Sequence, residues 1–205
     1  MAGRLTLVVG SKNPHKSEEI RRMLAGLPVE VVGLSDFGDV PDVIEEGVTL
    51  EENAAHKALF FARQTGCLVV SDDSGIEVDA IGGAPGVHSA RYAGDDATYD
   101  DNNRLLLSEL AGVPGPKRTA RFRCVIALAS PDGVVFTTEG AVEGRITAEP
   151  HGANGFGYDP VFYVDECGGT FAECPPEAKD AVSHRARALA AFKRRFAEYL
   201  AGLPL

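Results

Sequence analysis

The residues best suited to chemistry in this sequence are two adjacent carboxylates, Asp72 and Asp73, followed by Ser74 and Gly75. They come directly after Cys67–Val70, an apolar run that is short enough for a buried strand. Carboxylates at the end of a buried strand are costly unless cations or hydrogen-bond donors meet them, and ligands bind at that end of open α/β sheets. The pattern predicts a Mg²⁺ site with oxygen ligands, whereas an Asx-turn or a helix N-cap would explain the same residues without a ligand.

A polar turn near the N-terminus is a second candidate segment. It follows the apolar run Leu5–Val9, carries Lys12 and Lys16, and precedes a helical pattern. Backbone N–H groups and the helix dipole can bind phosphate in such a setting. The spacing is not that of a Walker A loop. The alternative is a plain turn with Asn13 as the cap and Pro14 at the first helical position.

A predicted helix over Thr49–Gln64 offers a further cation. Thr49 is followed three residues later by Glu52, the spacing of a capping box. Asn53 and Lys57 are four residues apart and therefore share one helix face. We expect this face to point toward the two carboxylates; the alternative is that Lys57 is a solvated surface lysine.

The glycine-rich segment His151–Tyr163 has the composition of a binding loop. Phe156 stands next to a glycine, and Asp159 follows three residues later. An aromatic ring can stack on a nucleobase, and a carboxylate can accept from a ring N–H. An ordinary turn leading into a short strand is the alternative interpretation.

The elements around these segments predict an α/β fold. Buried strands are expected at 5–9, 29–34 and 67–70, and long antiparallel strands at 119–130 and 134–142, joined by a turn at 131–133. Helices are expected after the first strand, at 49–64, at 98–110 and from about 176 to 200. The last helix would carry Lys179 and Ser183 on one side, because they are four residues apart.

Composition limits the class of protein. The chain has 205 residues, enough for one domain or one domain with an added lobe. Its formal charge of -10 argues against a protein that binds duplex nucleic acid. No signal peptide and no apolar run of transmembrane length is visible. The four cysteines show no C-x-x-C spacing; Cys167 and Cys174 could pair, but the set fits a reduced cytosolic protein better.

The joint order of the motifs is more specific than any one of them. From the N-terminus they read S-x-N-x-x-K, E-x-G-x-T-x-x-E-N-A-x-x-K-A, D-D-S-G, G-G-A-P-G-x-x-S-A-R-Y-x-G, F-G-Y-D-P and K-x-x-x-S-H-R. In this order the chain closely resembles the inosine triphosphate pyrophosphatase family, which clears non-standard purine nucleoside triphosphates such as dITP and XTP. The resemblance extends over nearly the whole chain, with mild departures at Ser71 and His88.

The resemblance implies Mg²⁺-dependent hydrolysis of ITP, dITP or XTP to the monophosphate and pyrophosphate. It implies that Asp73 is the general base, that Lys57 is the other catalytic residue, and that the metal ligands are Glu45, Asp73 and Asp72. It further implies that substrate is bound by Ser11, Lys12, Asn13, Pro14, His15, Lys16, Ser74, Phe156, Gly157, Tyr158, Asp159, Lys179, His184 and Arg185. Lysines suit this chemistry because a triphosphate must be neutralised before a nucleophile approaches.

The family's fold is a long twisted mixed β-sheet flanked by helices, which implies that residues 1–205 form one domain with two lobes and the active site in the cleft between them. The resemblance also implies a cytoplasmic homodimer that binds neither nucleic acid nor membrane. Rival hypotheses are the related Maf-like group, which hydrolyses other modified or pyrimidine triphosphates, a nucleotide sensor without turnover, and a nucleic-acid-binding protein.

Overall fold

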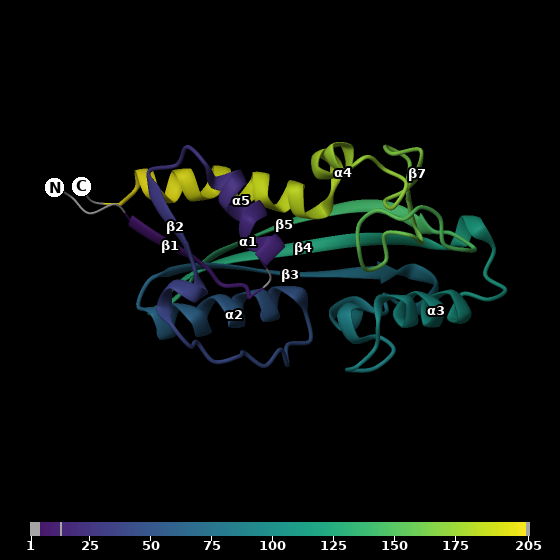
Figure 1. Cartoon of the computed structure of the whole chain (residues 1–205), viewed down its shortest axis with the longest axis horizontal. Coiled ribbons are helices and arrows are strands. Elements are labelled where there is room, and N and C mark those ends of the chain that lie inside the picture. The colour runs from purple at the N-terminus through teal and green to yellow at the C-terminus, as the bar shows by residue number, and fades with distance from the viewer. Residues whose placement is uncertain (1–4, 13, 204–205) are drawn as a thin grey trace. The chain divides into compact units, whose positions relative to one another are not determined.

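A seven-stranded mixed sheet is the framework of the chain. The computed structural model describes residues 5–12 and 14–203. The strand order is β2-β1-β3-β4-β5-β6-β7, and Figure 1 shows the long strands β3, β4 and β5 with the helices around them. The strands are β1 (Leu5–Val9), β2 (Val29–Gly33), β3 (Leu68–Val78), β4 (Thr119–Ser130), β5 (Gly133–Ile146), β6 (Phe162–Val164) and β7 (Gly169–Thr170). The α-helices are α1 (Pro14–Leu24), α2 (Leu50–Thr65), α3 (Tyr99–Glu109), α4 (Pro176–Val182) and α5 (His184–Ala201).

The chain divides into two compact units. The first comprises residues 1–73, 125–140 and 188–205, and the second comprises residues 74–124 and 141–187. Strands β3, β4 and β5 and helix α5 each contribute residues to both units. The predicted mixed sheet with flanking helices is therefore confirmed.

Parallel pairing organises the first unit. β1 pairs with β2 from Leu5↔Val29 onward, and it pairs with β3 up to Val9↔Val70. The paired residues of β3 are buried and apolar, as expected for a strand that is covered on both faces. Within this unit α2 lies on one side of the strands, and α1 and the end of α5 lie on the other (Figure 1). Asp72 and Asp73 thus begin two residues beyond the last β1–β3 pair.

The second unit is built around aromatic side chains. Phe122 of β4 packs edge-on against Phe162 of β6, and Phe162 and Phe171 are completely buried. Leu106 of α3 belongs to the same core cluster. This core supports the glycine-rich segment 151–163, which connects β5 to β6.

Two expected element boundaries are wrong. β3 does not end at Val70, as expected, but continues to Val78, so the carboxylates lie inside a strand. A strand tolerates them there because lysines from two helices neutralise both charges. The expected single C-terminal helix is two helices, because Ser183 has an extended backbone with ψ 154°. Its hydroxyl accepts from Ala186 N and caps α5 instead.

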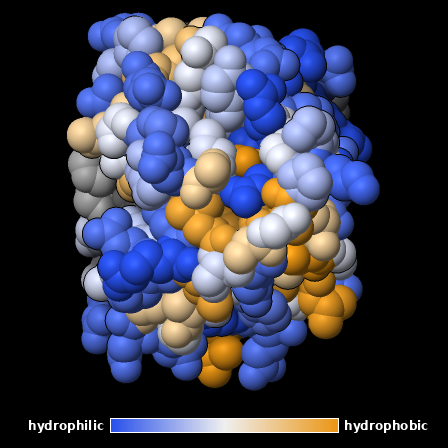
Figure 2. All heavy atoms as spheres, turned by 90° about the vertical axis from the view of Figure 1, so that its right-hand side faces the viewer, coloured by the Kyte–Doolittle hydropathy of each residue, from blue (hydrophilic) through white to orange (hydrophobic). Residues whose placement is uncertain are grey.

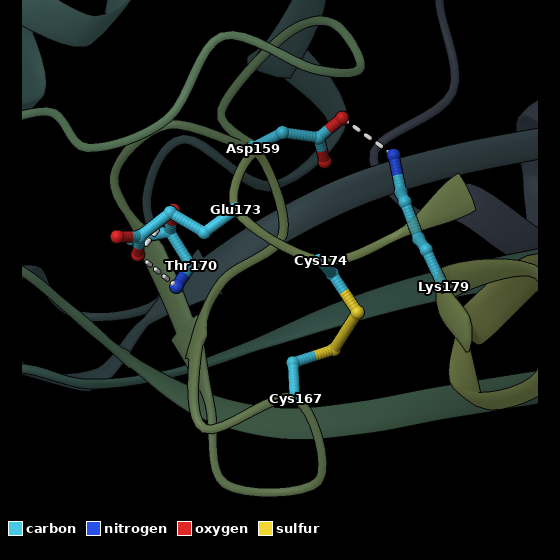
Figure 3. The surroundings of a disulfide bond; sticks show 6 residues. All are labelled: Asp159, Cys167, Thr170, Glu173, Cys174 and Lys179. Carbon is cyan, nitrogen blue, oxygen red and sulfur yellow. Dashed lines mark hydrogen bonds and ion pairs between the residues drawn. A yellow bond between two sulfur atoms is a disulfide. The ribbon is translucent and has the colours of Figure 1, made fainter. Parts of the chain in front are cut away.

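The cysteines differ from expectation. Cys167 and Cys174 form a disulfide with a Cα–Cα distance of 5.6 Å, so the prediction that they are reduced is wrong (Figure 3). Of the other two, Cys124 is buried and Cys67 is partly exposed, and both are free thiols. The disulfide removes the cysteine-based argument for a reducing compartment. Within the described residues, no helix is long and apolar enough to cross a membrane.

Candidate active site

A group of carboxylates and lysines in the first unit is the candidate catalytic centre. We call it the carboxylate–lysine cluster; its members are Lys16, Glu45, Lys57, Asp72 and Asp73. Lys57 is 8% exposed, and its ammonium donates to Glu45 Oε1 at 2.8 Å and to Asp73 Oδ1 at 3.0 Å. The prediction that Lys57 faces the carboxylates is confirmed, and a solvated surface lysine is excluded.

The two adjacent carboxylates form ion pairs with lysines from different helices. Successive side chains of a strand point to opposite faces, and Asp72 meets Lys16 of α1 at 2.9 Å, whereas Asp73 meets Lys57 of α2. Each lysine is held by a helix that packs on its own side of the strand. The Asp-Asp pair therefore presents one carboxylate to each face of β3.

Asn53 fixes the loop that carries Glu45. Its Oδ1 accepts from Gly47 N at 2.8 Å, and a Cβ on Gly47 would stand 2.5 Å from that same oxygen. Gly47 is required because any side chain would collide with Asn53. The glycine and the asparagine of the motif E-x-G-x-T-x-x-E-N thus hold the Glu45 loop against α2. Asn53 is a positioning residue that the predicted site set did not include.

Capping of α2 differs in one detail from the predicted capping box. Thr49 Oγ1 accepts from Glu52 N at 3.1 Å, as expected for an N-cap. The Glu52 carboxylate accepts from Val48 N rather than from the cap residue's own N–H. Both contacts order the turn between the Glu45 loop and the helix that carries Lys57.

The turn after β1 is tied to β3. Gly10 N donates to Val70 O at 2.8 Å, and Ser71 Oγ donates to Gly10 O at 3.1 Å. A Cβ at Gly10 would lie 2.2 Å from Ser71 Oγ, so the backbones approach as closely as glycine allows. Ser11 follows directly and Lys12 pairs with Asp42 at 2.7 Å. Pro14 and His15 begin α1, while Asn13 lies outside the described residues.

Burial and charge act in opposite directions on the central ion pair. Burial raises the pKa of Asp73, and Lys57 and Asn53 only partly offset it, so the pKa lies above its ordinary value. Burial by itself would lower the pKa of Lys57, but the charges of Asp73, Asp72 and Glu45 together outweigh it and raise the pKa. The lysine is therefore a fixed cation, and Asp73 is a carboxylate whose pKa is displaced toward neutral pH.

The cluster has the donor chemistry of a Mg²⁺ site. Asp73 Oδ2 is buried and accepts no hydrogen bond from the described residues, and the Lys57 ammonium shows that a positive charge is held between Asp73 and Glu45. Both ligand candidates are hard oxygen donors, as Mg²⁺ prefers. The described part of the chain contains no group of three His, Cys, Asp or Glu arranged to hold a metal. Mg²⁺ commonly takes one or two carboxylates together with water and phosphate oxygens, so two suffice.

A second set of predicted site residues lies in the second unit. Asp159 is 3% exposed, and its Oδ2 accepts from Phe156 N at 2.8 Å and from the Lys179 ammonium. In Figure 3 the Lys179 side chain extends from α4 toward Asp159. The ring of Phe156 is 54% exposed, and the same ammonium lies 5.1 Å from its centroid. We call Phe156, Asp159 and Lys179 the aromatic–carboxylate site.

The S-H-R residues begin α5 beside the aromatic core. The imidazole of His184 stacks on Phe122 at 4.8 Å with an interplanar angle of 12°, and Arg185 is 9% exposed. The side chain of Tyr158 is 4% exposed, and its hydroxyl donates to Ser89 O at 2.8 Å. Burial raises the pKa of this phenol, and its assignment as a substrate contact stays a prediction. Ser74 follows Asp73 on β3.

A pocket of the second unit carries none of the predicted site residues. It has a volume of about 480 Å³ and is lined by Gly115, Pro116, Arg118 and Arg145–Ala148. The Arg118 guanidinium donates hydrogen bonds to the backbone carbonyls of Val113, Leu110 and Thr147. Figure 2 shows a face on which hydrophobic residues gather in one patch among polar ones. The residues that line the pocket include no carboxylate and no histidine.

The fold is that of a mixed α/β protein, and the carboxylate–lysine cluster is its candidate site. A sequence profile of the Ham1 family matches residues 7–195. The chain belongs to the Ham1 family, and the resemblance predicted from the motifs is confirmed.

Individual relatives agree with this assignment. A dITP/XTP pyrophosphatase of Geobacter sulfurreducens is 54% identical over 187 residues, covering 91% of this chain and 94% of the relative. One from Syntrophobacter fumaroxidans is 52% identical over 194 residues, covering 95% and 83%. A HAM1 protein structure from Coxiella burnetii superposes with a TM-score of 0.89 at 40% identity, covering 95% of this chain and 99% of the other. A Mycobacterium abscessus nucleoside-triphosphatase / dITP/XTP pyrophosphatase gives 0.77 at 44% identity, covering 92% and 98%.

Proposed function

We propose that this chain is a Mg²⁺-dependent pyrophosphatase that hydrolyses ITP, dITP and XTP to the monophosphate and pyrophosphate. The observation that carries the proposal is the Lys57 ammonium held between Glu45 and Asp73. Hydrolysis of a phosphoanhydride requires fixed positive charge, a metal and a base, and this cluster combines groups for all three. The relatives' activity toward dITP and XTP agrees with it.

The chain's own residues have distinct roles in the proposed reaction. Glu45 and Asp73 would hold the metal, and Asp72, which pairs with Lys16 on the other face of β3, would reach it only through water. Bound Mg²⁺ screens the phosphate charge and lowers the pKa of a coordinated water. Lys16 and Lys57 neutralise phosphate oxygens, and the turn at 11–16 offers N–H groups at the start of α1.

Proton transfer is assigned to Asp73. It accepts the proton of the attacking water, and a pKa raised by burial makes it a stronger base than an exposed aspartate. Ser74 donates to a phosphate oxygen. This assignment accounts for a carboxylate whose Oδ2 is buried without a hydrogen bond from the described residues.

Base recognition is assigned to the second unit. Phe156 stacks on the purine, Asp159 accepts from a ring N–H, and His184 and Arg185 donate to the 6-oxo group. Lys179 joins Lys16 and Lys57 in neutralising phosphate. A donor aimed at position 6 faces another donor when adenine binds, and such unmatched buried groups discriminate strongly. We further propose that the active form is a cytoplasmic homodimer and that neither nucleic acid nor membrane is a partner.

The decisive experiment measures pyrophosphate release from a panel of nucleoside triphosphates with and without Mg²⁺. We expect release from ITP, dITP and XTP only with the metal, and slow release from ATP, dUTP and TTP. Asp73→Asn should lower kcat by about 10²–10⁴-fold, the range for loss of a general base, while its circular dichroism spectrum stays unchanged. Asp132→Asn in the β4–β5 turn is the matched control. Near-normal turnover by Asp73→Asn would remove the base assignment.

A further inference from the structure

The second unit exposes a pair of aromatic rings side by side. Tyr99 is 53% exposed and Phe156 is 54% exposed, and their ring centroids are 6.3 Å apart with an interplanar angle of 41°. Single exposed apolar residues are common on protein surfaces, whereas exposed apolar groups that lie together can mark a binding site. The exposed pair is therefore a candidate contact surface for a ligand.

Helix α3 places Tyr99 next to the aromatic–carboxylate site by a specific contact. Asn103 stands one helical turn after Tyr99, is 5% exposed, and its Nδ2 donates to Gly157 O at 2.9 Å. Residues four apart share a helix face, so the face that holds the Phe156–Asp159 loop also presents Tyr99. The first turn of α3 is itself fixed by Thr98 and Asp101, which form a capping box.

We infer that Tyr99 is a substrate-contacting, specificity-determining residue: its ring extends the Phe156 surface so that both rings of a purine base are covered. The inference rests on the proposed function, since it requires that Phe156 stacks on a base. The phenyl ring of Phe156 covers about one of the two rings of a purine. The neighbouring ring of Tyr99 enlarges the area on which the base can stack. Asn103 is a positioning residue that acts through the Gly157 carbonyl.

The polar surroundings fit a base rather than an apolar ligand. The Lys179 ammonium lies over Phe156 at 5.1 Å and is ion-paired with Asp159. A flat heterocycle with N–H and C=O groups on its edge matches an aromatic surface bordered by a carboxylate and an ammonium. A purely apolar partner would cover this ion pair without offering either charge a further hydrogen bond.

The test compares Tyr99→Ala with Tyr99→Phe. Stacking on an aromatic residue changes base affinity by about tenfold when the ring is lost, so we expect Tyr99→Ala to raise KM for dITP about tenfold with little change in kcat. Tyr99→Phe should retain KM within twofold, because it keeps the ring. Binding of Mg²⁺-tripolyphosphate, which has no base, should be unchanged in both variants. Phe37→Ala, at a 37% exposed phenylalanine of the first unit, is the matched control.

Several results would overturn the inference. They are an unchanged KM in Tyr99→Ala, an equal loss in Tyr99→Ala and Tyr99→Phe, and weaker tripolyphosphate binding. A Tyr99→Ala protein that loses self-association in light scattering at unchanged KM would identify the pair as a subunit contact and overturn it too. Failure of the proposed function gives another signature: wild-type protein would release no pyrophosphate from dITP, or Phe156→Ala would leave KM unchanged.

Discussion

At the scale of single residues, the central feature is a lysine that keeps two carboxylates close together. Lys57 neutralises Glu45 and Asp73 in a largely buried place. Without it, two like charges would face each other where water screens them poorly. The cluster is therefore preorganised, because the charges proposed to bind metal and phosphate already hold one another in position.

Lys57→Met tests this at the residue scale. The variant keeps the length of the side chain but leaves Asp73 without its main counter-charge, and removal of one partner of a buried pair is strongly destabilising. We expect kcat to fall at least about 100-fold. Because Lys57 lowers the pKa of Asp73 against the effect of burial, its loss raises that pKa. The acidic limb of the residual pH–rate profile should move to higher pH.

Lys117→Met, at an exposed lysine of the second unit, is the control and should leave both kcat and the acidic limb unchanged. An acidic limb of Lys57→Met that stays in place or moves to lower pH would show that Asp73 is not the titrating base.

At the scale of elements, most of the fold follows from the sequence. The strands at 5–9 and 119–130 and the helix after Thr49 lie where apolar runs and capping residues predict them. Such elements are decided by local patterns, because one face or both faces must be buried. The face shared by Asn53 and Lys57 was also predictable, since helical spacing alone fixes it.

The elements that were mispredicted are decided by distant partners. The sequence predicts that the strand ends at Val70, because two aspartates break the buried pattern, but Lys16 and Lys57, distant in sequence, neutralise them. The break at Ser183 interrupts a continuous helical pattern, and only its capping contact with Ala186 marks it. The Cys167–Cys174 bond likewise could not be chosen from spacing, because a free pair has the same sequence.

The prediction at the scale of elements concerns how much the Cys167–Cys174 disulfide stabilises the fold. It joins residues seven apart in sequence, and closing so short a loop stabilises the fold by about 2.5 kcal/mol in the chain-entropy account. The loop is linked to the aromatic–carboxylate site, since Ala172 N donates to Asp159 O at 3.2 Å. We expect the double variant Cys167→Ser, Cys174→Ser to melt about 5–10 °C lower in calorimetry. A dithiol should lower the wild-type Tm equally by reducing the bond.

The control is to add the dithiol to the double variant, which has no disulfide to reduce, so its Tm should not change. The single variants Cys167→Ser and Cys174→Ser should each melt like the double variant. Equal melting temperatures for untreated wild type, reduced wild type and double variant would mean that the bond contributes nothing to stability.

At the scale of the whole molecule, an acidic protein is proposed to bind a polyanion. The formal charge is -10, so the overall field repels a nucleoside triphosphate. In the proposed function, binding then depends on the local cations Lys16, Lys57 and Lys179. Because the proposed base contacts are other residues, we predict that phosphate affinity and base affinity can be lost separately.

Two partial ligands test whether phosphate affinity and base affinity can be lost separately. Mg²⁺-tripolyphosphate carries the phosphates without the base, and inosine monophosphate carries the base with one phosphate. A ligand at 100 times its Kd stabilises a protein by about 2.7 kcal/mol, which raises Tm by about 5–10 °C for a chain of this size. Glu45→Gln should lose the rise in Tm with tripolyphosphate and keep the rise with inosine monophosphate, because Glu45 is a proposed metal ligand. Phe156→Ala should show the reverse pattern.

Glu46→Gln, at the exposed neighbour of Glu45, should keep both shifts, as should Phe37→Ala. The opposite losses in Glu45→Gln and Phe156→Ala are expected only if phosphate and base affinities depend on different residues, since general damage to the fold would reduce both shifts in each variant. If each variant lost both shifts equally, the separate assignment of phosphate and base contacts would be wrong.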